Sequence, residues 1–142
     1  MTILVLIDIS IILFIAGMHI YWALGGKWSL KVALPTNEKG EYVLSPEPVD
    51  SMIVGVVLIS FAAFHLVRIE LIPIPMPYWL GEMGSWIIGG IFILRAIGDF
   101  TYVGFFKRVK RTPFGRNDSN IYSPLCLLIG ILTLWVGMII SL

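Results

Sequence analysis

Ionisable side chains lie inside stretches of this sequence that are otherwise apolar enough to cross a membrane. The clearest case is Arg95-Ala96-Ile97-Gly98-Asp99, in which opposite charges stand four residues apart. On a helix this spacing places both side chains on one face, where each lowers the cost that the other meets on leaving water. The sequence therefore predicts an ion pair between Arg95 and Asp99 near the end of a membrane helix.

Further polar residues are expected at the same depth. A rise of about 1.5 Å per residue, counted from the ends of the apolar stretches, places His19 level with Arg95 and Asp99 on the cytoplasmic side. An arginine fork binds anionic groups, and histidine exchanges a proton near neutral pH. These residues predict a pocket for a small anionic ligand or a lipid head group; the alternative is an ion pair that only anchors the helix. The predicted ligand-binding residues are His19, Trp22, Arg95, Asp99, Tyr102 and Tyr122.

A second polar layer, on the outer side, is predicted to be structural. It contains Asp8, His65 and Arg68, and a contact of Asp8 with His65 or Arg68 would tie the first two spans together. Two histidines on different helices could bind a haem, but His19 and His65 differ in height by roughly 15 Å. No cofactor is therefore predicted.

Composition places the chain among integral membrane proteins. Of its 142 residues 58% are hydrophobic and only 13% are charged, and the mean hydropathy is +0.92. The single cysteine, Cys126, cannot form an intrachain disulfide or a dithiol pair, and we expect it to pack as a small apolar residue. No metal-binding spacing occurs in the sequence, and no nucleic-acid partner is predicted.

The hydropathy pattern predicts an all-α integral membrane protein, a four-transmembrane-helix bundle formed by one domain over residues 1–142. The first span has no basic leading region and no small-residue cleavage site, so it is interpreted as retained rather than as a signal peptide. Ser123 and Pro124 suit the cap and the first position of the last helix. The four spans are expected at about 3–24, 52–69, 80–100 and 124–141.

Basic residues predict the orientation of the bundle. Lysines and arginines concentrate in the connections between spans one and two and between spans three and four, which places both connections in the cytoplasm and both termini outside. The run from Phe105 to Arg111 is typical of a topology signal, with binding of lipid head groups as the alternative. Gly81, Ser85 and Gly89 form a small-residue stripe that favours close helix packing within the bundle over a dimer face.

Several motifs resemble a family of small bacterial four-span membrane proteins that is described only as a domain of unknown function. The resemblance covers nearly the whole chain and implies location in the bacterial cytoplasmic membrane. It also implies that the matching positions form one assembly in the cytoplasmic half, while Asp8, His65 and Arg68 belong to none of the motifs. The motifs are His19 to Trp28, Ala33-Leu34-Pro35, Arg95 to Arg108 and Tyr122 to Cys126.

Two classes of function stay open at this point. One is binding or transport of a small anionic ligand or lipid head group; the other is a structural or accessory subunit of a membrane complex, without ligand chemistry. No enzyme class is indicated, because the sequence lacks the zinc-protease, nucleophile-elbow and phosphate-loop motifs. The partners expected are membrane lipids and either a second copy of the chain or another membrane protein.

Overall fold

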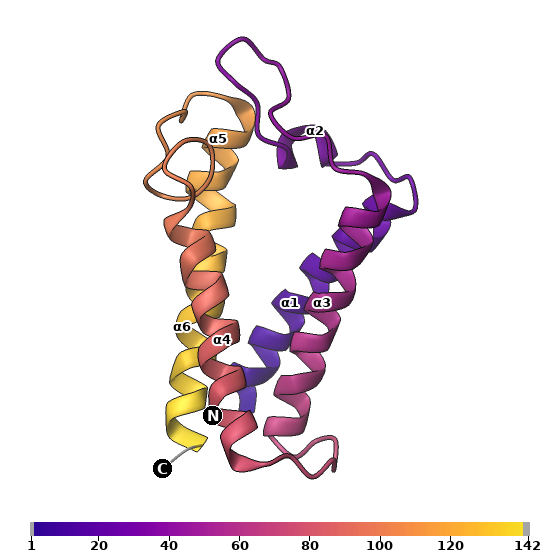
Figure 1. Cartoon of the computed structure of the whole chain (residues 1–142), viewed down its shortest axis with the longest axis vertical. Coiled ribbons are helices and arrows are strands. Elements are labelled where there is room, and N and C mark those ends of the chain that lie inside the picture. The colour runs from indigo at the N-terminus through magenta and orange to yellow at the C-terminus, as the bar shows by residue number, and fades with distance from the viewer. Residues whose placement is uncertain (1, 141–142) are drawn as a thin grey trace.

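The computed structural model describes residues 2–140 and shows an all-helical chain (Figure 1). Four helical segments are long and apolar enough to cross a membrane, the fourth being continuous from Pro113 to Ile140. The prediction of an all-α membrane protein with four spanning helices is confirmed. The elements in chain order are α1 (Thr2–Ala23), α2 (Leu30–Ala33), α3 (Pro48–Arg68), α4 (Tyr78–Ile97), α5 (Pro113–Asn117), the π-helical turn η1 (Asp118–Tyr122) and α6 (Ser123–Ile140).

The four long helices form two pairs, α1 with α3 and α4 with α6 (Figure 1). Glycines allow each pair to pack closely. A Cβ atom added to Gly89 of α4 would lie 3.2 Å from the carbonyl oxygen of Gly130 on α6, and one added to Gly55 of α3 would meet Ile20 of α1. Close approach of two backbones is typical of helix association in a membrane, where the hydrophobic effect does not drive the helices together.

The small-residue stripe on α4 is used inside the molecule. Gly81 lies against the guanidinium of Arg68 on α3, and Ser85 lies against Gly137 on α6. With Gly89 also packed against α6, all three positions of the stripe contact neighbouring helices of the same chain. The stripe therefore serves packing within the bundle.

The two pairs lie close together near the ends of the chain and move apart toward the other end of the bundle (Figure 1). We call these the terminal end, where α1 begins and α6 ends, and the loop end, which carries α2 and α5. Ile12, Leu58 and Ile129, from three different helices, belong to one buried cluster, and the rings of Phe61 and Phe92 join α3 to α4 with centroids 6.3 Å apart. Many apolar side chains on the outer faces are exposed, as expected for a lipid-facing surface.

α4 ends at Ile97, before the predicted end of its span at Phe100. The backbone reverses at Gly98, where φ is +90°, a conformation that glycine adopts without strain. A Cβ atom there would collide with the carbonyl of Val103, and one at Gly104 would collide with that of Ile97. The chain therefore folds back tightly at residues 98–104, and Asp99 no longer belongs to the helix.

The prediction that Ser123 and Pro124 begin the last helix is wrong. The helix begins eleven residues earlier in the sequence, after Thr112, whose hydroxyl accepts a hydrogen bond from the Gly115 N–H at 3.0 Å, with Pro113 at its first position. Pro124 lies inside the helix, where it has no N–H to donate and its ring crowds the preceding turn. The π-helical turn η1 directly before it widens the backbone there, and the Ser123 N–H bonds to the Asp118 carbonyl.

Candidate functional site

Arg95 binds Asp118 and not Asp99, so the predicted ion pair is wrong. The Arg95 Nη2 atom lies 2.8 Å from Asp118 Oδ1, across the contact between α4 and the first turns of the last helix. Asp118 is fully buried. The four-residue spacing predicted the Asp99 pair only for a helix that continues to residue 99, and α4 ends at Ile97.

Asp99 holds the reversed segment instead. One of its carboxylate oxygens accepts hydrogen bonds from the backbone N–H groups of Thr101, Tyr102 and Val103 at 2.8–2.9 Å. Desolvation raises the pKa of this carboxyl, but the backbone hydrogen bonds outweigh it and hold the pKa below its ordinary value. Asp99 is exposed and acts as a local cap, not as the counter-ion of Arg95.

Lys107 is the second cation on Asp118. Its ammonium group donates to Asp118 Oδ2 at 2.9 Å, to the Gly104 carbonyl at 2.8 Å and to the Ser119 hydroxyl at 2.7 Å. The Gly104 N–H also donates to Asp118 Oδ2, at 2.7 Å. Lys107 is only 1% exposed, so it is not one of the surface cations that the basic run of residues 105–111 suggested.

The cluster of Arg95, Lys107 and Asp118, here called the Asp118 cluster, therefore holds two cations and one carboxylate. Among residues 2–140 no other carboxylate lies within ion-pair distance of either cation. The Arg95 Nη1 atom is buried and has no hydrogen-bond partner, although the side chain as a whole is 33% exposed. A surplus positive charge with an unused donor is costly in a dry environment and favours an anionic group beside it.

Arg95 lies near the end of α4, and its guanidinium reaches Asp118 in the last helix of the same pair. It lies about two turns beyond the buried Ile88, on the face from which Phe92 reaches Phe61 of α3. Arg95 is thus close to the end of α4 at Ile97, and this end of α4 belongs to the loop end, where the two pairs have moved apart (Figure 1).

His19 lies near the loop end of α1. It lies about three turns beyond Asp8, whose side chain contacts α6, so both are on the face of α1 that looks toward the second pair. Its Nδ1 atom is buried without a hydrogen-bond partner, and its ring meets that of Trp22 edge-on with centroids 5.1 Å apart. Within the described residues, no hydrogen bond, ion pair or ring contact joins His19 to Arg95 or Asp99.

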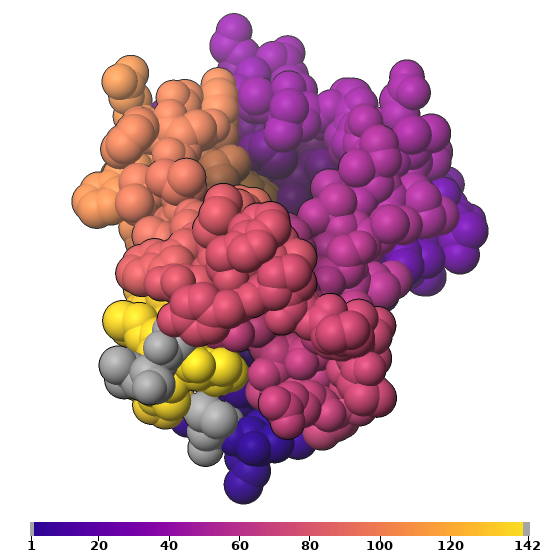
Figure 2. All heavy atoms as spheres, turned by 60° about the horizontal axis from the view of Figure 1, so that its bottom comes forward, coloured from indigo at the N-terminus to yellow at the C-terminus, as the bar shows by residue number. Residues whose placement is uncertain are grey.

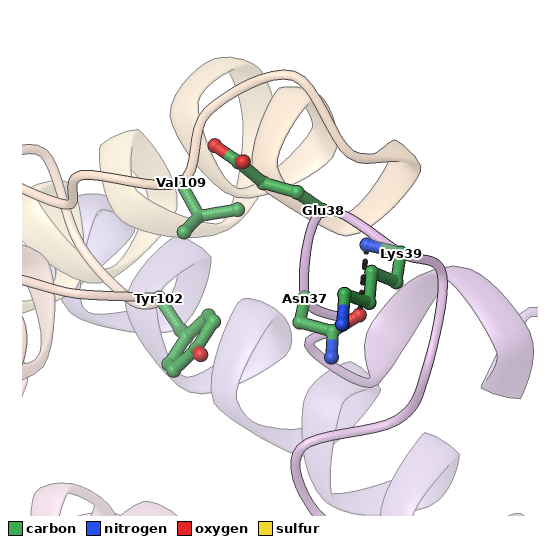
Figure 3. A pocket seen from close by; sticks show the side chains of 5 residues that line it. All are labelled: Asn37, Glu38, Lys39, Tyr102 and Val109. Atoms are coloured by element: carbon green, nitrogen blue, oxygen red, sulfur yellow. Dashed lines mark hydrogen bonds between the residues drawn. The ribbon is translucent and has the colours of Figure 1, made fainter.

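Two cavities lie at the loop end, and each is lined by one aromatic residue of the predicted ligand-binding set, Tyr102 or Trp22. A cavity of about 320 Å³ opens between the α2–α3 connection and the α4–α5 segment, where Tyr102 and Val109 face Asn37, Glu38 and Lys39 (Figure 3). Figure 2 shows a recess between the purple and the orange-red surfaces of these two parts.

The second cavity, of about 200 Å³, is lined by Trp22, Gly26 and Ser51 among others. The Trp22 indole N–H donates to the Trp28 carbonyl at 2.9 Å, which fixes the turn after α1. Tyr122 lines neither cavity; its hydroxyl lies 3.5 Å from the Val32 carbonyl of α2. The structure thus distributes the six predicted ligand-binding residues around the loop end and does not bring them into one pocket.

At the terminal end, Asp8 and His65 come together and Arg68 stays apart from Asp8. The His65 Nε2 atom lies 3.6 Å from Asp8 Oδ2, and Thr133 of α6 contacts both. Arg68 lies against Gly81 of α4, with its Nε and Nη2 atoms buried and unpartnered. The predicted contact of Asp8 with His65, which links the first two spans, is present. Thr133 extends this contact to the fourth span.

Three residues that matter most were not singled out in the sequence. Lys107 was only one of the basic residues in the run from Phe105 to Arg111, and no prediction was made for Asp118 or Thr133. The Thr112-Pro113 pair carries the same start signal as Ser123-Pro124, and it would have placed Asp118 on a helix. No cluster of three metal-ligating side chains occurs in residues 2–140.

Together the four apolar helices and the buried polar groups define a multi-pass membrane protein. Residues 12–133 match a family described as "Protein of unknown function (DUF3995)". The chain belongs to this family, which confirms the resemblance noted in the sequence. No curated protein and no solved structure matches the chain.

Proposed function

We propose that this protein binds an oxyanion at its loop end, between the two helix pairs, with Arg95 as the principal contact. The oxyanion is either the head group of an anionic membrane lipid or a small soluble anion that the protein binds or transports. The observation that carries the proposal is the Asp118 cluster, in which two cations share one buried carboxylate and the Arg95 Nη1 donor is unused.

The surroundings support this assignment. The unpartnered His19 Nδ1 atom supplies a second polar group on the opposite pair. The cavities beside Tyr102 and Trp22 lie at the same end of the bundle, although Arg95 and His19 line neither of them. Positive charge in the loops predicts that this end faces the cytoplasm, where anionic lipid head groups and metabolites are both available.

The test measures binding to the full chain in nanodiscs. One arm compares phosphatidylglycerol with phosphatidylcholine nanodiscs by native mass spectrometry; the other titrates inorganic phosphate in phosphatidylcholine nanodiscs. Arg95→Gln should lower the affinity for the anion about tenfold or more, the loss expected for a charge-assisted hydrogen bond. Arg111→Gln, which removes an exposed loop cation instead, is the matched control.

The two arms separate the two sources of the anion. Selective retention of phosphatidylglycerol assigns a lipid, and saturable phosphate binding assigns a soluble anion. Equal losses in Arg95→Gln and Arg111→Gln would mean unspecific surface attraction and would contradict the proposed site. A preparation that retains a stoichiometric membrane protein and no anion would favour the accessory-subunit alternative.

A further inference from the structure

The buried polar contact at the terminal end joins three helices through one hydroxyl group. Asp8 of α1, His65 of α3 and Thr133 of α6 are 0%, 2% and 0% exposed. Thr133 Oγ1 lies 3.1 Å from Asp8 Oδ2 and 3.2 Å from His65 Nε2. The His65 Nδ1 atom lies 2.7 Å from the Phe61 carbonyl oxygen.

The possible positions of hydrogen atoms in this contact are restricted. The Phe61 carbonyl can only accept, so Nδ1 of His65 must carry a hydrogen. The Thr133 hydroxyl has one hydrogen and can donate it to Asp8 or to His65, but not to both. Whichever partner does not receive that hydrogen must supply one of its own.

Two arrangements satisfy every contact, and both hold the same number of protons. In the first, protonated Asp8 donates to Thr133, which donates to neutral His65. In the second, His65 is an imidazolium that donates to Thr133, which donates to the Asp8 carboxylate. A proton moving from Asp8 Oδ2 to Thr133 Oγ1, while the hydroxyl proton moves to His65 Nε2, converts the first into the second.

Removing or adding one proton breaks this balance. Without the shared proton, the Asp8 carboxylate takes the Thr133 hydrogen, and the bare Nε2 lone pair of His65 faces an oxygen lone pair. With an extra proton, His65 carries a buried charge that no carboxylate neutralises. Asp8 Oδ1 has no partner, which is tolerated far better by a neutral acid than by a carboxylate.

The ionisable groups nearby are few. α3 contributes Arg68, one turn beyond His65, and α4 contributes Tyr78 and Glu82, which interact with Arg68. α1 offers only His19 and Tyr21 besides Asp8, both near its loop end, and α6 offers only Cys126. No other carboxylate of the described residues lies within ion-pair distance of His65.

We propose that Asp8, Thr133 and His65 form a proton-binding site that holds one exchangeable proton, and that this proton strengthens the link between α6 and the α1–α3 pair. The site lies where the two helix pairs converge, and its three side chains come from both pairs. Release of the proton as the pH rises removes one of its hydrogen bonds and weakens this link.

The experiment uses the full chain in nanodiscs with ¹⁵N-labelled histidine, of which the chain contains only two. Nitrogen NMR follows the protonation of His65, assigned with His19→Gln, and infrared difference spectroscopy follows the carbonyl band of protonated Asp8. In the wild type the Asp8 acid band and the His65 imidazolium signal together account for one proton, so whichever of them is present should be lost at one common midpoint as the pH is raised, and the Tm should fall over the same range.

Three variants make the outcome decisive. Asp8→Asn mimics the protonated acid, so it should fold, lack the infrared band and lose the pH dependence of Tm. Thr133→Val should split the common midpoint in two, whereas Thr133→Ser should keep it. The proton site is refuted if His65 titrates identically in the wild type and in Asp8→Asn, or if neither an Asp8 carboxylic acid band nor a His65 imidazolium signal is lost as the pH of the folded wild type is raised. Anion binding at Arg95 is unaffected by either result, so the two proposals fail separately.

Discussion

At the scale of single residues, Asp118 determines the roles of Arg95, Lys107 and the Gly104 backbone. The sequence showed that Arg95 needs a counter-charge in the membrane, because an isolated arginine there is costly. It could not show which carboxylate supplies it, since that depends on where α4 ends. A single glycine with positive φ, Gly98, removes Asp99 from the helix and leaves Arg95 to the more distant Asp118.

Replacing Asp118 should destabilise the protein far more than replacing Asp99. Asp118→Asn leaves Arg95 and the buried Lys107 without a carboxylate, and breaking a buried ion pair in this way costs about 3–5 kcal/mol. Asp99→Asn keeps an oxygen that accepts the same backbone hydrogen bonds and should cost less than about 1 kcal/mol. Unfolding in mixed micelles measures both, and comparable losses would show that the Asp118 cluster does not stabilise the fold.

Asp99 gives the reversed segment a dependence on acid pH. Backbone hydrogen bonds lower the pKa of this carboxyl in the folded chain. Its stabilising contribution is thus fully present above the ordinary carboxyl pKa and is lost as the pH falls through the lowered value. Hydrogen exchange, corrected for intrinsic rates, should show that the amides of Thr101, Tyr102 and Val103 lose protection only as the pH falls through the lowered pKa of Asp99. Protection that declines near neutral pH would contradict this assignment.

At the scale of elements, the last helix shows how two similar sequence signals compete. Thr112-Pro113 and Ser123-Pro124 both suit a helix start, and the chain uses the first. The second proline is accommodated inside the helix by the π-helical turn η1, which carries Asp118. Hydropathy and the Ser123-Pro124 cap signal together placed the start at the second pair, because residues 113–122 are more polar than the span that follows them.

Removing the side-chain hydroxyl of Thr112 should therefore lower the stability of the protein more than removing that of Ser123. Thr112→Ala removes the hydroxyl that accepts from the Gly115 N–H and should cost about 1 kcal/mol. Ser123→Ala removes a buried hydroxyl that has no hydrogen-bond partner, so its cost should be near zero. Equilibrium unfolding measures the free energy of unfolding of the two variants. A larger loss of this free energy in Ser123→Ala than in Thr112→Ala would place the start of the helix at Ser123-Pro124, as the sequence predicted.

At the scale of the whole molecule, apolar length was enough to predict four spans, because a chain must satisfy its backbone groups as helices in lipid. Which helices pair with each other within the bundle was not predictable from the sequence. The pairing depends on glycine contacts such as Gly89 with Gly130, which involve residues distant in the sequence. The separation of the two pairs at the loop end likewise follows from this pairing, and it keeps His19 of one pair apart from Arg95 of the other.

The orientation of the molecule stays a prediction, and it decides from which side a ligand reaches Arg95. Loop lysines and arginines place the loop end in the cytoplasm. With Cys126→Ser as background, cysteines can replace Lys39 at the loop end and Pro75 in the α3–α4 connection, both exposed. A membrane-impermeant maleimide added to intact cells should label the Pro75 position, and the Lys39 position only after lysis. Reversed labelling would place the Asp118 cluster at the outer face, and the anion would then have to come from outside the cell.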